Sequence, residues 1–195
     1  MPADTSNPLT VLSSTRIYEN EKIAFVDHHV RDPGGREHRY PIMHLKEPGV
    51  RILPIDQEGC TFLVGQYRFG GGYYSWELPA GGRSLEEAPL SGAMRELEEE
   101  AGLAAGRWLE LFHFVSAGSI TDEAPVAFLA WDLEPRERRP DDSEVLEIRR
   151  VPFGEALAMA LRGEIRDTAS VATLLGAHVR ALRGELPDEV APRLR

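Results

Sequence analysis

The chain has 195 residues, of which 42% are hydrophobic and 28% charged, and its formal net charge at pH 7 is -10. This composition excludes a disordered or fibrous protein and predicts one sizeable core, with room for a small appendage. The negative charge repels polyanions, so we expect no nucleic-acid partner, and a single cysteine, Cys60, excludes an intrachain disulfide and a cysteine metal cluster.

Hydropathy along the chain indicates no membrane partner. No window approaches the roughly 18 consecutive apolar residues that a spanning helix needs. Residues 1–8 lack the basic start and the apolar run of a signal peptide. We therefore expect a cytoplasmic protein.

The first half of the chain is typical of short, mostly antiparallel strands separated by turns. The expected strands are β-rich and bounded by Gly, Pro, Asp or Asn: residues 10–13, 23–26, 40–45, 50–55, 61–64 and 74–78. The expected turns carry Gly or Pro: residues 32–35, 47–49, 56–59 and 70–72.

A change of period over residues 89–101 predicts a helix, because apolar residues recur there at spacings of three and four. The expected apolar stripe consists of Leu90, Ala93, Met94, Leu97 and Ala101. Pro89 suits the first helical position, and Gly102 suits the residue just past the end.

The remaining elements complete a layered fold. Further strands are expected at 108–114, 126–133 and 145–151, and helices at 153–162 and from Asp167 to about 182, with Asp167 as the capping candidate. Strands before and between helices, without regular alternation, predict an α+β domain with α/β/α layers. Residues 184–195 contain two prolines and mixed charges, and we expect a flexible tail there.

Three acidic residues of the predicted helix share a second face: Glu96, Glu99 and Glu100, with Glu98 pointing away. Like charges three and four apart repel by a few tenths of a kcal/mol per pair, so the cluster opposes the helix unless a cation binds there. Carboxylate ligands suit Mg²⁺ or Mn²⁺. The alternative is a solvated acidic face without a ligand.

The spacing around this helix reads Gly81-x5-Glu87-x7-Arg95-Glu96-Leu97-x-Glu99-Glu100-x-Gly102-Leu103. This pattern resembles the complete signature box of the Nudix hydrolases, and the resemblance extends over about residues 9–180. It implies a Nudix α/β/α sandwich with a mixed sheet. It also implies an enzyme that cleaves a nucleoside diphosphate linked to another moiety, using divalent ions and a metal-activated water.

The resemblance assigns roles to residues of the box. Glu96, Glu99 and Glu100 become metal ligands for two or more Mg²⁺ ions, or Mn²⁺, with Glu99 or Glu100 bridging ions and acting in catalysis. The residue before the first box glycine, Ala80, lends its backbone carbonyl to a metal.

The other box residues are implied to be structural. Glu87 and Arg95 form an ionic tie between loop and helix. Gly81 and Gly82 let the loop backbone pass close to metal and phosphate. Gly102 closes the helix.

The segments flanking the box narrow the branch of the family. Gln66-Tyr67-Arg68 and Trp76-Glu77-Leu78-Pro79-Ala80-Gly81 resemble the ADP-ribose and nucleoside-diphosphate-sugar pyrophosphatases, in which these segments bracket the substrate. Arg68 and Glu77 are thereby implied to bind substrate, since an arginine offers a planar fork to a phosphate or stacks on a base.

The implied reaction is hydrolysis of ADP-ribose to AMP and ribose 5-phosphate. The runner-up is a GDP-mannose-type or UDP-glucose-type sugar nucleotide pyrophosphatase. A third possibility, from another class, is a non-catalytic sensor of ADP-ribose or a nucleotide sugar.

The N-terminal strands resemble a β-subdomain that this branch exchanges between two subunits. The resemblance implies a homodimer, with residues 1–46 as the dimerisation subdomain and residues 47–183 as the Nudix domain. Tyr18 and Phe25 are our candidates for stacking on the base, beside Tyr40, and the alternative is that each packs in a core.

Two acidic segments are candidates for the general base. Asp141-Asp142-Ser143-Glu144 resembles an acidic loop that supplies this base in relatives, so Glu144 is the first candidate. Glu123 is the second, at the end of a segment from Ser116 that takes the place of a Ser-Pro-Gly segment, with alanine or glycine for the proline. The alternative is a solvated loop acid.

Overall fold

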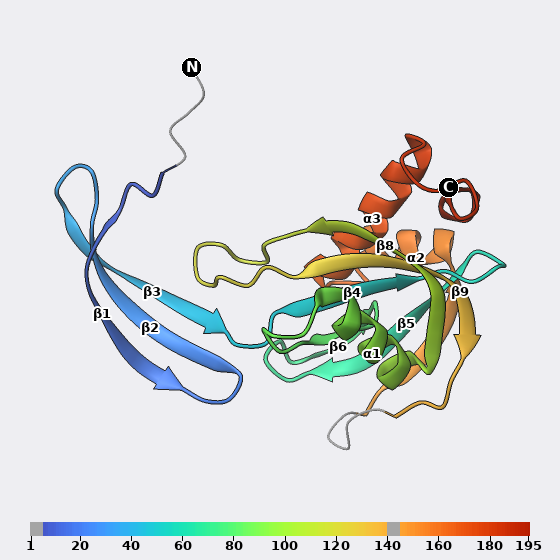
Figure 1. Ribbon diagram of the computed structural model, residues 1–195, viewed down its shortest axis with the longest axis horizontal. Coiled ribbons are helices and arrows are strands. Elements are labelled where there is room, and N and C mark those ends of the chain that lie inside the picture. Colours follow the sequence, from blue (N-terminus) through green and yellow to red (C-terminus); the bar gives the residue numbers. More distant parts are fainter. Residues whose placement is uncertain (1–5, 140–144) are drawn as a thin grey trace.

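Three antiparallel strands near the N-terminus form a sheet of their own in the computed structural model, which describes residues 6–139 and 145–195. They are β1 (Thr10–Glu19), β2 (Ile23–Arg31) and β3 (Glu37–Leu45), paired in that order. Figure 1 shows this sheet to one side of the rest of the chain, which it joins after β3. β1 is an edge strand and is exposed along its whole length.

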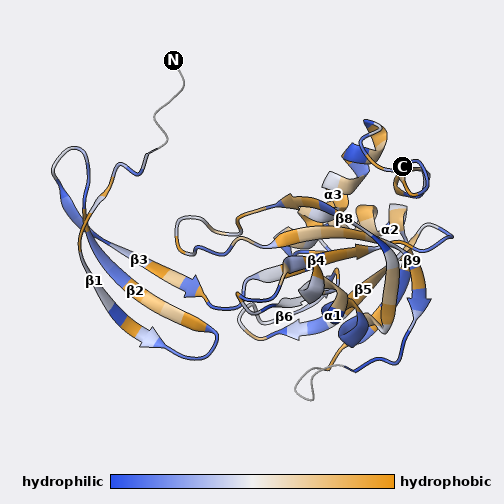
Figure 2. Cartoon of the chain, viewed as in Figure 1, coloured by the Kyte–Doolittle hydropathy of each residue, from blue (hydrophilic) through white to orange (hydrophobic). Residues whose placement is uncertain are grey.

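Two further sheets form the body of the molecule. One has the order β7 (Ala80–Gly82), β4 (Gly49–Pro54), β9 (Val126–Pro135) and β8 (Leu103–His113), with β4 parallel to β9 and the other pairs antiparallel. The other, antiparallel, has the order β10 (Glu147–Pro152), β5 (Cys60–Arg68) and β6 (Tyr73–Glu77). The predicted mixed sheet is confirmed, and Figure 2 shows apolar residues along β5 and β9.

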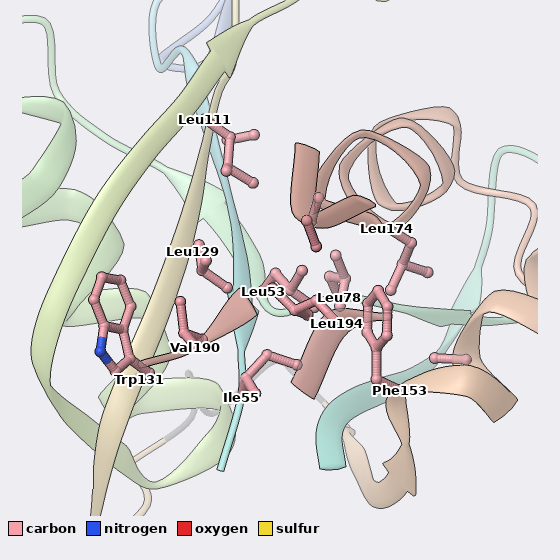
Figure 3. Packing of buried hydrophobic residues seen from close by; sticks show 14 of the residues in the cluster. Leu53, Ile55, Leu78, Leu111, Leu129, Trp131, Phe153, Leu174, Val190 and Leu194 are labelled. Carbon is pink, nitrogen blue, oxygen red and sulfur yellow. The ribbon is translucent and has the colours of Figure 1, made fainter. Parts of the chain in front are cut away.

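Alternating residues of β9 build two cores, one on each face of the mixed sheet. Val126, Phe128 and Ala130 belong to the core that α1 (Pro89–Ala101) covers. The core on the other face contains Leu129 and Trp131 and is covered by α2 (Phe153–Leu161) and α3 (Thr168–Leu182). Figure 3 shows this second core, with Leu129 beside Val190 and Leu174 beside Phe153. The α+β fold with helices on both faces is therefore confirmed.

The helix predicted at 89–101 has the expected bounds, but its buried face differs from the predicted one. Gly102 is left-handed at φ 65°, and its N–H donates to Glu98 O. Leu90 and Met94, placed on the apolar stripe, are exposed, whereas Glu96 and Glu100 are buried. The reason is that α1 packs through Ala93 and Leu97 and turns its neighbouring acidic side chains toward the loop at β7.

The expectation of a flexible C-terminal tail is wrong. Leu186, Val190 and Leu194 are buried in the core beneath α3, and Ala191–Leu194 forms the 3-10 helix η1. The Nδ1 of His178 lies 2.8 Å from Leu194 O. The prolines and charges that suggested a tail alternate with apolar residues that reach the core, so their burial holds the segment in place.

Across the described ranges, no helix is both long enough and apolar enough to cross a membrane.

Candidate active site

The box helix and the loop at β7 approach each other closely. The backbone N–H of Ala80 donates to Glu100 Oε2 at 2.8 Å. A Cβ placed on Gly81 would lie 2.0 Å from Glu96 Cδ and 2.2 Å from both carboxylate oxygens. A side chain at residue 81 would therefore collide with the Glu96 carboxylate, a reason for glycine that the sequence pattern did not reveal.

Arg95 ties this helix to the loop, as predicted, and also bonds to two of the acidic residues. Its Nη2 lies 3.4 Å from Glu87 Oε2 and donates to Gly82 O at 2.8 Å. Its Nη1 donates to Glu96 Oε1 at 2.6 Å and to Glu99 Oε2 at 2.9 Å. Partial burial acts to lower the pKa of Arg95, but the hydrogen bonds to Glu96 and Glu87 raise it above the ordinary value. The cation therefore offsets the repulsion between neighbouring carboxylates.

Two cavities share Gly81 and Gly82 in their linings. We name the first, of about 340 Å³, the arginine cavity, because Arg51 and Arg68 line it together with Glu100. The second, of about 320 Å³, we name the glutamate cavity, because it is lined by Glu96 and Glu99 and by Arg95.

The predicted metal ligands are thus divided between the two cavities. Within residues 6–139 and 145–195, no three acidic, histidine or cysteine side chains converge as a ready-made metal cluster. The donor set nevertheless consists of hard carboxylate oxygens, and the Glu96 carboxylate lies against the bare backbone of Gly81. These features fit a divalent ion such as Mg²⁺ in chemical kind.

Arg68 is held by Glu77, which the resemblance also assigned to substrate binding. Its Nε donates to Glu77 Oε1 at 2.7 Å and its Nη2 to Oε2 at 2.6 Å, a two-pronged ion pair. The Glu77 side chain is only 4% exposed. The hydrogen bond to Glu77 raises the pKa of Arg68, so the guanidinium is fixed and charged at the cavity wall.

A second arginine, Arg51 on β4, was missed by sequence reasoning. Its Nη1 donates to Leu78 O at 3.0 Å, and its Nη2 lies 3.2 Å from Asp167 Oδ2. Asp167, predicted only as a helix cap, does cap α3, because its carboxylate accepts Ser170 N–H at 2.7 Å. The available signal was that Arg51 is the one charge in the apolar run from 50 to 55.

The loop after β8 brings Glu123 to the arginine cavity. A Cβ on Gly49 would lie 3.3 Å from Glu123 Oε1, so the carboxylate sits against β4. The adjacent Asp122 lies 2.6 Å from His44 Nδ1 at the end of β3. Burial acts to raise the pKa of Asp122, but the hydrogen bond with His44 and others bring it below the ordinary value. Glu144 lies outside the described residues.

Two more residues without a predicted role line these cavities. Glu47, which the sequence placed in a turn, lines both of them. Lys22, from the turn between β1 and β2, lines the glutamate cavity. Nothing in the sequence indicated this for Lys22, because its turn lies far from the box in sequence and only the folded chain brings the two together.

The candidate stacking residues Tyr18 and Phe25 lie outside both cavities of this chain. Tyr18 and Phe25 are paired in register on β1 and β2, outside the linings of the arginine and glutamate cavities. Tyr18 is 54% exposed and Phe25 36% exposed, so neither packs in a core. In the single chain, both rings are therefore open to solvent and outside a core.

Comparisons with known proteins agree with this geometry. The family model of the NUDIX domain matches residues 45–173. The chain is 33% identical over 171 residues to an ADP-ribose pyrophosphatase of Mycobacterium tuberculosis (strain ATCC 25618 / H37Rv), covering 86% of this chain and 82% of that protein. It is 30% identical over 159 residues to an ADP-ribose pyrophosphatase of Bacillus subtilis (strain 168), covering 80% and 85%. The crystal structure of an ADP compounds hydrolase has the same fold, with a TM-score of 0.82 at 21% identity, covering 94% of this chain and 98% of that one.

Proposed function

Since the chain belongs to the NUDIX domain family, we propose that it hydrolyses the diphosphate bond of a nucleoside diphosphate sugar, with ADP-ribose as the preferred substrate. The products would be AMP and ribose 5-phosphate. The observation that carries the proposal is the meeting of the box carboxylates with two fixed arginines around the Gly81–Gly82 backbone. The similarity to two ADP-ribose pyrophosphatases supports the choice of substrate.

The box glutamates would hold the divalent ions. Glu96, Glu99 and Glu100 supply oxygen ligands, with the Ala80 carbonyl as a further candidate, and Mg²⁺ or Mn²⁺ suits such a set. When bound, the ions supply charge neutralisation of the diphosphate and an activated water. Glu87 and Arg95 keep the helix in register with the loop.

The remaining residues orient the substrate and move the proton. Arg68, fixed by Glu77, offers its remaining N–H groups to phosphate oxygens. Glu123, which lines the arginine cavity, would accept a proton from the attacking water, and Glu144 is the other candidate.

An assay of a substrate panel tests this function. We expect ADP-ribose to give AMP and ribose 5-phosphate in the presence of Mg²⁺, and EDTA to abolish turnover, because the carboxylates then lack the ion that neutralises the diphosphate. The panel includes GDP-mannose, UDP-glucose and a dinucleoside polyphosphate, with products resolved by chromatography. Faster cleavage of GDP-mannose or UDP-glucose would favour the sugar-nucleotide alternative, and binding of ADP-ribose without turnover would favour the sensor.

We also propose that residues 1–46 form a dimerisation subdomain, joined to a catalytic domain over residues 47–183. An exposed edge strand is prone to pair with another chain. β1 carries several exposed apolar side chains: Val11, Leu12, Ile17 and Tyr18. Figure 2 also shows apolar stretches on β2 and β3. In an exchanged dimer, Tyr18 and Phe25 would serve the partner's cavity.

Sedimentation equilibrium checks the dimer. We expect a mass twice the 21.7 kDa of one chain, and a shift toward monomer for Ile17→Glu, because a charge on β1 opposes burial of that strand. Leu161→Glu is the matched control, since Leu161 is also exposed but ends α2. A wild-type chain that sediments as a stable monomer at micromolar concentration would contradict the proposal.

A further inference from the structure

Arg51 lies where a charge is costly to the fold. It is the one charged residue of β4 and its side chain is only 13% exposed. Along the strand it shares a face with Leu53, which packs in the core beneath α3. A guanidinium in this position loses most of its hydration. Its ion pairs and hydrogen bonds must offset this desolvation cost.

The positive end of a helix also lies near the charge of Arg51. Asp167, which contacts Arg51, caps the N-terminus of α3, the end of the helix that carries partial positive charge. An uncharged side chain of similar length would fill the same space on β4 without this conflict. Packing alone therefore does not account for an arginine at residue 51.

The partners of Arg51 orient it without saturating it. A guanidinium has five N–H donors. Within the described residues, the contacts of Arg51 are Leu78 O on Nη1, Asp167 on Nη2 and a longer approach of 3.7 Å to Glu77 Oε2. Donors therefore remain for a ligand in the arginine cavity, which Arg51 lines.

Arg68, which lines the same cavity, is likewise held by a carboxylate. Glu77 occupies its Nε and one side of its Nη2, which leaves Nη1 to the cavity. The other charged groups of this cavity wall are mainly carboxylates, among them Glu47, Glu100 and Glu123. The chain as a whole carries a net charge of -10, so an anion needs local cations to bind here.

We propose that Arg51 is a substrate-binding residue that, together with Arg68, holds the phosphate oxygens of the diphosphate in the arginine cavity. Asp167 is the positioning residue that aims Arg51. This inference rests on the proposed function for its ligand, a nucleoside diphosphate sugar. It adds a phosphate contact that is independent of the divalent ion.

Isothermal titration in EDTA tests this contact without turnover. The probes are ADP-ribose and inorganic pyrophosphate, and the variant is Arg51→Met, which keeps the length of the side chain and removes the charge. We expect the Kd of both probes to rise by about tenfold or more, the range for a lost charge-assisted hydrogen bond. Arg150→Met is the control, since Arg150 is paired with Asp56 and Glu58 outside both cavities, and its Kd should stay at the wild-type value.

A second pair of variants separates binding from structure. If Arg51 only neutralises the charge of Asp167, the double variant Arg51→Met with Asp167→Asn restores the wild-type Kd, because it removes both charges of the pair. If Arg51 holds phosphate, the double variant binds as weakly as Arg51→Met. Arg51→Lys serves where the methionine variant fails to fold, since lysine keeps the charge but cannot make the same fork, and its Kd should also rise.

Results that would overturn the role of Arg51 differ from results that would overturn the proposed hydrolysis. Unchanged Kd values in Arg51→Met, restoration by the double variant, or a loss for ADP-ribose but not for pyrophosphate would each overturn the inference. A wild-type chain that binds neither probe at millimolar concentration in EDTA would overturn it too. A wild-type chain that binds in EDTA but hydrolyses nothing with Mg²⁺ overturns the proposed function and leaves this contact standing.

Discussion

Glu99→Gln is expected to lower the kcat of ADP-ribose hydrolysis at saturating Mg²⁺ by at least about a hundredfold, the scale of losing one electrostatic contact to the transition state. The amide has the same shape as the carboxylate and still accepts a hydrogen bond from Arg95, so the local packing survives. The lost charge weakens the hold on a divalent ion. Initial rates at several Mg²⁺ concentrations give the kcat, and the unfolding temperature reports on the fold.

The matched control for this variant is Glu98→Gln. Glu98 is the neighbouring residue on the same helix, carries the same chemistry and is exposed to solvent. We expect its kcat to stay within about twofold of wild type, as for most surface substitutions. A Glu99→Gln enzyme as active as Glu98→Gln would remove Glu99 from the catalytic machinery.

Gly81→Ala is the second substitution with a large expected effect. Its methyl group would lie 2.0 Å from Glu96 Cδ, a separation that forces either the loop or the carboxylate to move. Glu96 is buried and bonded to Arg95, so its displacement also disturbs the contacts of that arginine. We expect kcat/KM to fall by about a hundredfold or more, since a displacement of about 1 Å has this effect on a positioned group.

Gly82→Ala provides the comparison for this glycine. Its methyl group would lie 3.1 Å from Glu47 Cβ, a close contact that a shift of a few tenths of an ångström relieves. For Gly82→Ala we expect a kcat/KM within a few-fold of wild type. The circular dichroism spectra of Gly81→Ala and Gly82→Ala should both resemble that of the wild type. Equal losses in Gly81→Ala and Gly82→Ala would mean that the loop is sensitive as a whole, and that the Glu96 approach has no special role.

Local signals in the sequence predicted the box helix well. Pro89 and Gly102 mark its two ends by backbone chemistry that does not depend on the rest of the fold. The early strands were also located, but β1 runs from Thr10 to Glu19 and not to residue 13, because polar residues of an edge strand give no apolar signal. The unbroken apolar run at the start of β9, residues 126–131, is typical of a strand that is covered on both faces.

The features that sequence reasoning missed depend on contacts between distant residues. The burial of Glu96 and Glu100 follows from the bare backbone at Gly81, which hydropathy does not represent. The role of Arg51 depends on Asp167, 116 positions along the chain from it. The C-terminal segment looked like a tail because only the folded core reveals the space that Leu194 fills.

Hydrogen bonds between β3 and the loop after β8 affect which substitutions this chain can accept during evolution. Met43 N–H donates to Ile120 O at 2.8 Å, and Leu45 N–H donates to Asp122 at 3.2 Å, so β3 holds the loop whose next residue is Glu123. These two hydrogen bonds connect β3 to one wall of the arginine cavity. Selection on the N-terminal sheet and selection on the cavity therefore act on shared residues.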